Sequence, residues 1–199
     1  MERHCLVTVG ATVGFRALIE PVLEPSFWRF LRDEAFTALH IQAGPDARWA
    51  AARVAALRHE MPTGFDVDVF DITADLMRHQ MLRCKAREAV RAPGLVISHA
   101  GTGTILDAWR VAVPLIVVPN PALLDDHQNE LARHLAHGGY ATMAEPRLDD
   151  LKDAVHKSDL LRDEPRACQR PNAVDAPLRL WDIRPSDVAT EEASRMAHD

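Results

Sequence analysis

The sequence has no apolar segment long enough to cross a bilayer as a helix, because its longest apolar run covers only residues 111–119 and contains a proline. It has only 3 cysteines in 199 residues, Cys5, Cys84 and Cys168. Their wide spacing argues against a disulfide framework and against a structural zinc site. An excess of basic residues is also absent, since Lys and Arg total 23 against 29 Asp and Glu. The formal net charge of -6 therefore disfavours a dedicated nucleic-acid binder.

The remaining composition is that of a folded domain. With 47% hydrophobic and 26% charged residues, the sequence is not that of a disordered chain. Its first residues, MERHCLVTVG, have a strand pattern and lack the basic start and cleavage site of a signal peptide. We therefore expect a cytoplasmic protein with one main domain.

Short apolar runs rich in Val, Ile and Leu recur along the chain. Such runs predict strands that are buried on both faces, as in a parallel sheet. They occur at residues 5–9, 38–42, 67–70, 95–98, 115–118 and 140–143. Helices fit between them: Phe15, Leu18 and Val22 share one helical face, and a stripe at 131–136 stops before a Gly-Gly pair. The sequence therefore predicts an α/β fold, a Rossmann-like doubly wound parallel sheet.

We expect this domain to cover residues 1–164. Residues 165–199 have a different pattern, with prolines at 165, 171, 177 and 185 and no strong apolar period. The piece APLRLWDI at 176–183 is a candidate docking segment, and the last residues form a polar tail.

Two loops follow strands at the edge where open parallel sheets bind ligands. Gly10, Ala11 and Thr12 come directly after the first predicted strand. The segment SHAGTGT, residues 98–104, follows the fourth strand and opens a helix. We therefore expect a ligand to bind at these two loops.

The second loop has the composition of a diphosphate site. Gly101 and Gly103 are expected to adopt positive φ and to admit a ligand closely. Thr102 and Thr104 add hydroxyl groups, and a helix beginning near Thr104 would aim free N–H groups at the ligand. A tight strand-to-helix turn capped by threonine is an equally good interpretation. The loop is neither a Walker loop nor a GxGxxG fingerprint, because no Lys follows and position 106 is Leu.

Further polar residues follow these loops. Asp107 either accepts hydrogen bonds from ribose hydroxyls or complements the helix dipole. His127 and Gln128 open the helix after the fifth strand. Two interpretations are open here: Asp125 and Gln128 form a capping-box variant, or His127 and Gln128 reach sugar or phosphate groups.

The run LVISHAGTGTILDAWRVAVPLIVVPNPALLDDHQNELARHLAHGGY, Leu95 to Tyr140, resembles the donor-binding, C-terminal half of GT-B glycosyltransferases of the MurG type. Within that group it is most similar to the catalytic subunits of the eukaryotic UDP-N-acetylglucosamine transferase of dolichol-linked oligosaccharide synthesis. The motif VTVGAT with Phe15 behind it, and IQAG at 41–44, match the same family.

The resemblance implies a UDP-GlcNAc-dependent enzyme that adds the second GlcNAc to GlcNAc-diphosphodolichol with inversion. It implies a heterodimer at the cytosolic face of the endoplasmic reticulum, in which a membrane-anchored subunit binds the acceptor. Docking on that subunit would use Leu178, Leu180, Trp181 and Ile183, unless these residues cover the domain's own sheet. We expect no cofactor and no metal, because the only DxD match, at 66–68, lies within a strand pattern.

The resemblance also assigns site residues. His99 and the helix N-terminus would stabilise the leaving diphosphate, and the base is expected from the partner. Asp107 stands where the superfamily has a ribose-binding Glu, and Asp126 replaces a common Asn. The candidate diphosphate- and sugar-binding residues are Gly10, Ala11, Thr12, Ser98, Gly101, Thr102, Gly103, Thr104, Asp107, His127 and Gln128.

Other functions remain open. A non-catalytic UDP-sugar-binding or scaffold homologue is the main alternative. An epimerase or a stand-alone glycosyltransferase normally needs both GT-B halves, and an NAD-binding protein needs the missing GxGxxG.

Overall fold

The computed structural model describes residues 1–71, 76–120 and 127–163, with only the backbone at residues 76–78, 127, 162 and 163. A 6-stranded parallel sheet has the order β3-β2-β1-β4-β5-β6. The strands are β1 (His4–Thr8), β2 (Ala38–Gln42), β3 (Asp66–Phe70), β4 (Leu95–Ser98), β5 (Leu115–Val117) and β6 (Thr142–Met143). This is the order of a classic Rossmann sheet, so the predicted α/β, Rossmann-like doubly wound fold is confirmed.

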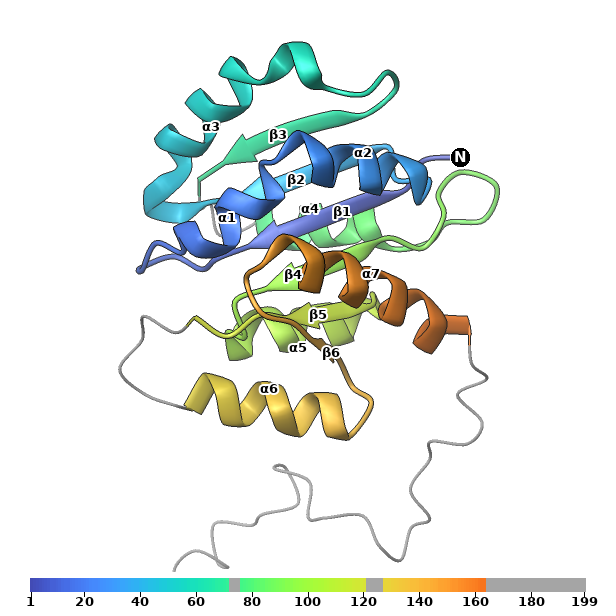
Figure 1. Cartoon of the computed structure of the whole chain (residues 1–199). Helices are drawn as coiled ribbons and strands as arrows, with labels where there is room; N and C mark the ends of the chain where they lie inside the picture. Colours follow the sequence, from blue (N-terminus) through green and yellow to red (C-terminus); the bar gives the residue numbers. More distant parts are fainter. Residues whose placement is uncertain (72–75, 121–126, 164–199) are drawn as a thin grey trace, which may run out of the picture. The chain divides into compact units, whose positions relative to one another are not determined.

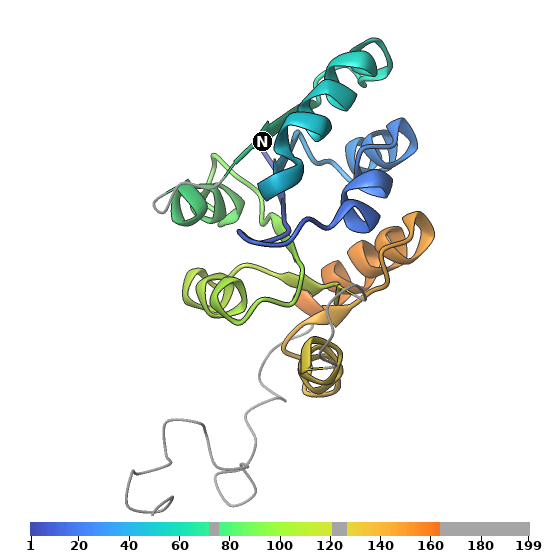
Figure 2. The ribbon, with the colours of Figure 1, turned by 90° about the vertical axis from the view of Figure 1, so that its left-hand side faces the viewer.

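Helices cover both faces of the sheet (Figures 1 and 2). One face carries α1 (Arg16–Val22), α2 (Pro25–Asp33), α3 (Ala47–Ala56) and α7 (Leu148–Asp163). The other face carries α4 (Leu76–Cys84), α5 (Thr102–Val111) and α6 (His127–His137). Two 3-10 turns, η1 (Gly44–Asp46) and η2 (Arg58–Glu60), flank α3.

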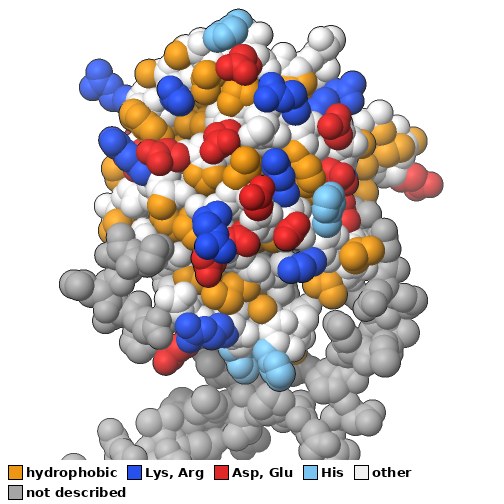
Figure 3. Space-filling model, in the orientation of Figure 1, with side chains coloured by type: hydrophobic (Ala, Val, Ile, Leu, Met, Phe, Trp, Pro, Cys, Tyr) orange, Lys and Arg blue, Asp and Glu red, His pale blue; other side chains and the backbone are white. Residues whose placement is uncertain are grey.

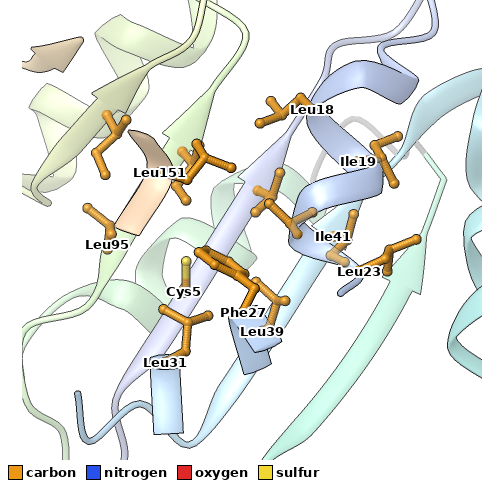
Figure 4. Close-up of a cluster of buried hydrophobic side chains, with 14 of the residues drawn as sticks. Cys5, Leu18, Ile19, Leu23, Phe27, Leu31, Leu39, Ile41, Leu95 and Leu151 are labelled. Atoms are coloured by element: carbon orange, nitrogen blue, oxygen red, sulfur yellow. The ribbon is translucent and has the colours of Figure 1, made fainter. Parts of the chain in front are cut away.

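Alternation along each strand explains why the apolar runs are continuous. In β1, Cys5 and Val7 belong to the core under α1 and α2, whereas Leu6 belongs to the core under α4 and α5. Figure 4 shows the first of these cores, where Phe27 of α2 packs over the sheet. Because both faces are buried, every residue of β1 has to be compatible with burial, and all five are buried.

The helix signals are confirmed as well. Phe15, Leu18 and Val22 are buried on one side of α1. The stripe at 131–136 lies in α6, which ends before Gly138, and Gly139 has a φ of 68°. A glycine with positive φ is a common helix stop.

The surface of the described part is mixed in charge. Figure 3 shows acidic and basic side chains interspersed on the face that carries α1, α2 and α7. None of the helices in the described ranges combines the length and the hydropathy of a membrane span. The predicted extension, residues 165–199 with Leu178, Leu180, Trp181 and Ile183, lies outside the described residues.

Candidate functional site

The ends of β1, β2 and β4 bring three polar residues side by side. Thr8 is in register with Gln42 of β2 and with Ser98 of β4. The strand order reverses between β1 and β4, since β2 and β3 lie on one side of them and β5 and β6 on the other. Ligands of open α/β sheets bind outside such a switch point. The loops after β1 and β4 therefore form the candidate site, at the ends of the strand arrows in Figure 1.

The first loop leaves β1 at Gly10, and Gln42 holds both polar groups of that residue's backbone. The Gly10 N–H donates to Gln42 Oε1 at 3.1 Å, and Gln42 Nε2 donates to Gly10 O at 2.9 Å. The same Oε1 accepts hydrogen bonds from Thr8 Oγ1 at 2.8 Å and from the Val9 N–H at 3.2 Å. Gly10 has a φ of 87°, which other residues rarely adopt. The loop therefore starts in a fixed, glycine-dependent conformation.

The segment after β2 supports this loop from below. A Cβ on Gly44 would lie 2.6 Å from Gly10 O, so the two backbones are in close contact. Further along, Asp46 accepts a hydrogen bond from Arg16 Nε at 2.8 Å. Ala11 and Thr12, the predicted ligand contacts, are exposed above this support.

The second loop differs from its predicted backbone. Helix α5 begins at Thr102, two residues earlier than expected, and its N-cap is Gly101 with a φ of -72°. The positive φ, 64°, belongs to Ala100, and Gly103 is helical. The predictions of positive φ at Gly101 and Gly103 are therefore wrong, and the threonine-capped turn is not formed. A glycine is needed at position 101 because a side chain there would collide with a neighbouring residue, and not because the backbone has a positive φ.

That neighbouring residue is His99, whose ring packs between Gly10 and Gly101. A Cβ on Gly101 would lie 2.5 Å from His99 Nε2, and a Cβ on Gly10 would lie 2.8 Å from the same atom. Neither glycine can therefore carry a side chain unless the imidazole moves. His99 consequently connects the two loops.

The protonation of His99 follows from its neighbours. Its backbone N–H donates to Thr8 O at 3.1 Å, and its Nδ1 lies 3.3 Å from the same oxygen. A carbonyl oxygen only accepts, so Nδ1 carries the proton and Nε2 of the neutral ring keeps a lone pair. Burial lowers the pKa of His99, and the hydrogen bond to Thr8 opposes this shift only in part. The ring is therefore neutral at pH 7.

The start of α5 supplies free backbone donors. The Ile105 N–H donates to Gly101 O at 3.1 Å. The N–H groups of Thr102, Gly103 and Thr104 come before this bond, at helix positions without an intrahelical partner. Thr102 and Gly103 are exposed, and a Cβ on Gly103 would meet nothing within 4 Å. With the positive end of the helix dipole, these groups form an accessible anion site.

Ser98 lies beneath the loop. It is fully buried, and its Oγ has no hydrogen-bond partner among the described residues. The accessible polar groups of the loop therefore begin at His99.

Asp107 lies further along α5, where its carboxylate accepts a hydrogen bond from Arg110 Nη1 at 3.1 Å. Its side chain is 44% exposed. It borders a cavity of about 360 Å³ between α4 and α5, lined by Met81, Leu82, Lys85, Asp107, Arg110 and Val111. The carboxylate is thus accessible to a ligand, and its contact with a ribose stays a prediction.

The described residues directly after β5 contact the start of α6. Gln128 of α6 accepts a hydrogen bond from the Asn120 N–H through Oε1, at 3.3 Å. His127 is the first residue of α6, but its side chain lies outside the described part, as do Asp125 and Asp126. The predicted contacts of His127 and Gln128 with a donor sugar stay predictions.

Metal ligands do not gather in the described ranges. Within residues 1–71, 76–120 and 127–163, no three His, Cys, Asp or Glu residues are placed to hold a metal ion. Asp66 and Asp68 lie in β3, as expected, and Asp68 is hydrogen-bonded to His40 Nδ1.

Sequence reasoning missed the supporting residues Gln42 and Gly44. The motif IQAG contributed to the family resemblance, but no role was assigned to it. A buried polar residue at the end of an apolar strand, followed closely by glycine, was the available signal.

Comparison with known proteins identifies relatives of the whole described domain. Residues 4–171 match the model of the glycosyltransferase family 28 C-terminal domain. The UDP-N-acetylglucosamine transferase subunit ALG13 of Candida glabrata is 32% identical over 169 residues, which cover 76% of this chain and 84% of that protein.

Solved structures of two other proteins are similar to this domain. The NMR structure of ALG13 is 27% identical with a TM-score of 0.58, over 80% of this chain and 86% of that chain. The crystal structure of Acinetobacter baumannii MurG is 20% identical with a TM-score of 0.55, over 80% of this chain and 42% of that chain. The second likeness concerns the fold alone.

Proposed function

Because this chain belongs to the glycosyltransferase family 28 C-terminal domain family, we propose that it is the donor-binding catalytic subunit of an N-acetylglucosaminyltransferase. The donor is UDP-GlcNAc, and the reaction adds the second GlcNAc to GlcNAc-diphosphodolichol during N-glycan precursor assembly. The Candida glabrata relative is a UDP-N-acetylglucosamine transferase subunit, which supports both UDP-GlcNAc as the donor and the role of this chain as a subunit.

The proposal includes a membrane-anchored partner. That partner binds the lipid-linked acceptor, supplies the base for the acceptor hydroxyl, and holds the chain at the cytosolic face of the endoplasmic reticulum. The apolar residues proposed to dock on it are Leu178, Leu180, Trp181 and Ile183.

One observation carries the proposal: the His99 ring joins the Gly10 loop to the free N-terminus of α5 at the switch point of the sheet. The donor's diphosphate is proposed to lie over Gly103, where the backbone is open. As the bond between the anomeric carbon and the diphosphate oxygen breaks, negative charge grows on the leaving UDP. Backbone N–H groups and the helix dipole stabilise that charge without a metal ion. Displacement by the acceptor oxygen on the opposite face inverts the anomeric centre.

The remaining groups of the donor have neighbouring candidates. Asp107 is exposed on α5 and is proposed to accept hydrogen bonds from the ribose hydroxyls. Its shorter side chain, compared with the Glu of the superfamily, makes this contact longer or water-mediated. Gln128 and His127, at the start of α6, are proposed to contact the donor sugar.

A reconstituted transfer assay tests the function. The full chain is combined with the membrane subunit, GlcNAc-diphosphodolichol and one of UDP-GlcNAc, UDP-glucose or GDP-mannose. We expect a disaccharide product only with UDP-GlcNAc, undiminished by EDTA, and strongly reduced in His99→Ala but not in the exposed control His134→Ala. Donor binding without turnover would identify a non-catalytic homologue. A strict requirement for Mn²⁺ or Mg²⁺ would contradict the metal-independent mechanism.

A further inference from the structure

Gln42 makes more hydrogen bonds to the candidate site than any residue predicted from the sequence, although it does not itself reach the ligand region. The residue is 1% exposed and lies at the end of β2. We propose that Gln42 is a positioning residue, which sets the geometry of both donor loops and thereby the affinity for the donor diphosphate. This inference rests on the proposed function of the site.

The first route from Gln42 to the site runs through Gly10. The Gln42 amide fixes the Gly10 N–H and C=O together, at 3.1 Å and 2.9 Å. The Gly10 backbone therefore cannot rotate or shift without breaking both of its hydrogen bonds to Gln42. A Cβ built on Gly10 would lie 2.8 Å from His99 Nε2, so the His99 ring rests against this fixed backbone.

The second route runs through Thr8. Thr8 Oγ1 donates to Gln42 Oε1 at 2.8 Å. The carbonyl oxygen of the same residue accepts from the His99 N–H at 3.1 Å and lies 3.3 Å from His99 Nδ1. Gln42 and His99 thus hold the same two residues, Thr8 and Gly10, from opposite sides.

Only an amide of this length satisfies the arrangement. The oxygen accepts three hydrogen bonds and the nitrogen donates one, which requires both functions on one planar group. A glutamate keeps the accepting oxygen but loses the donor to Gly10 O. A methionine fills the space and offers neither. Gly44 adds a steric limit, since a Cβ there would lie 2.6 Å from Gly10 O.

The test compares Gln42→Met and Gln42→Glu with Ile41→Val in the full chain. Ile41 is the adjacent residue of β2, is fully buried in the apolar core, and its side chain lies on the opposite face of the sheet. Ile41→Val therefore disturbs the same strand without touching the loop contacts. It controls for a general loss of stability.

Two measurements made without UDP-GlcNAc test whether Gln42 positions the Gly10 loop and the His99 ring. In Gln42→Met, hydrogen exchange of the Gly10 amide should accelerate by about tenfold or more, since its acceptor is removed. The pKa of His99, followed by NMR, should rise toward its ordinary value as the ring gains contact with water. Ile41→Val should change neither quantity. A folded Gln42→Met with unchanged Gly10 exchange and His99 titration overturns the proposal.

A third measurement gives the effect of Gln42 on the affinity for UDP-GlcNAc. Isothermal titration with UDP-GlcNAc should show affinity weakened by about tenfold in Gln42→Met, as expected when the hydrogen bonds that hold the Gly10 loop are lost. In Gln42→Glu the loss should be smaller at low pH, because a protonated carboxyl can donate to Gly10 O. The ratio of this variant's affinity to that of the wild type should therefore rise as pH falls.

The outcomes separate the two proposals. Unchanged affinity in Gln42→Met, or a pH-independent ratio for Gln42→Glu, overturns the positioning role. A wild-type chain that binds no UDP-GlcNAc contradicts the proposed function, while the exchange and titration experiments still decide the role of Gln42. If Gln42→Met does not fold, the nearly isosteric Gln42→Glu provides the His99 titration and the affinity measurement, because it removes the donor to Gly10 O.

Discussion

His99 Nδ1 lies 3.3 Å from the carbonyl oxygen of Thr8, and this contact determines which ring nitrogen can meet a ligand. Nδ1 donates to Thr8, so the free atom is Nε2, which in the neutral ring only accepts. Burial also keeps the pKa of His99 below its ordinary value. A diphosphate oxygen needs a donor, and His99 therefore has to take up a proton to stabilise a bound diphosphate.

Donor binding should accordingly be pH-dependent. The diphosphate raises the pKa of His99 in the complex above that of the free chain, so binding takes up at most one proton. The affinity for UDP-GlcNAc should fall as pH rises, by no more than about tenfold per pH unit. Titration calorimetry from about pH 5.5 to pH 8, in buffers of different ionisation enthalpy, measures both the affinity and the proton uptake.

A matched pair of variants identifies the group responsible. His99→Gln offers an amide donor that does not titrate, so its affinity should be nearly independent of pH. His134→Gln changes an exposed histidine of α6 and should keep the wild-type profile. If the affinity of His99→Gln for UDP-GlcNAc kept the wild-type dependence on pH, the proton taken up on binding would belong to another group.

A substitution at Gly103 should change fold stability and donor affinity in opposite directions. A Cβ there meets nothing within 4 Å, and the residue lies in the first turn of α5. Gly103→Ala should therefore stabilise the fold by about 0.5–1 kcal/mol through helix propensity. The same methyl group would occupy the space proposed for the diphosphate, and affinity for UDP-GlcNAc should drop. Thermal unfolding with and without the donor measures both effects, and a variant that is more stable but binds normally would show that the diphosphate lies elsewhere.

The positions of the strands along the chain were predictable because burial on both faces leaves continuous apolar runs in the sequence. β2 and β4 match the predicted runs residue for residue, since a strand such as LVIS has apolar neighbours on either side. The loops were located by the rule that parallel sheets bind ligands at the ends of their strands. Periodicity and composition were sufficient for both.

The details of the site were not predictable, because they depend on contacts between distant segments. Gly101 is a glycine on account of the His99 ring, and the positive φ falls on Ala100, where composition gave no signal. Gln42 lies far from Gly10 in the sequence, and only the register of β1 with β2 brings them together. Contacts of this kind form only when the strands are paired in the sheet, so the local sequence does not predict them.

Mild acid should destabilise the fold through buried histidines. His4 Nδ1 lies 2.8 Å from His40 Nε2. Burial lowers the pKa of His4, the hydrogen bond that His4 donates to the Glu2 carboxylate opposes this shift, and the charges of His40 and Arg83 lower the pKa further. The pKa of His99 is also lowered by burial. The unfolded chain therefore binds protons more readily than the native state. The free energy of unfolding should be constant above the ordinary histidine pKa of about 6.5 and decrease below it.

Urea denaturation at about pH 7.5 and pH 5.5 measures this decrease. His4→Gln should reduce the difference in unfolding free energy between the two pH values, because one of the buried titrating groups is removed. His134→Gln, exposed on α6, should leave the difference as in the wild type. Equal stability of the wild type at both pH values would refute this linkage.

Arg3 anchors α7 to the start of the sheet. It donates two hydrogen bonds to Asp159, at 2.6 Å and 2.8 Å, and its guanidinium lies 3.9 Å from the centre of the Phe36 ring. The two side chains are only 10% and 25% exposed. Asp159→Asn should destabilise the protein by about 3 kcal/mol, because it leaves a buried cation without its counter-charge.

The control for this pair lies at the start of the same helix, where Asp150 of α7 pairs with the residue just before the helix. Arg147 and Asp150 also form an ion pair at 2.6 Å, but the Arg147 side chain is 69% exposed. Asp150→Asn should change the urea midpoint very little, since water screens this interaction. Similar midpoints for Asp159→Asn and Asp150→Asn would show that the Arg3 contact does not stabilise α7.

The most direct test of the central claim is a calorimetric titration of the full chain with UDP-GlcNAc, UDP-glucose and GDP-mannose, alone and with the membrane subunit present. A ligand that binds only the native state also raises its thermal stability, which gives a second readout from the same samples. We expect binding that is selective for UDP-GlcNAc and that is lost when Gly101→Val displaces the His99 ring. Equal binding of all three nucleotide sugars, or no binding of UDP-GlcNAc even with the membrane subunit, would contradict it.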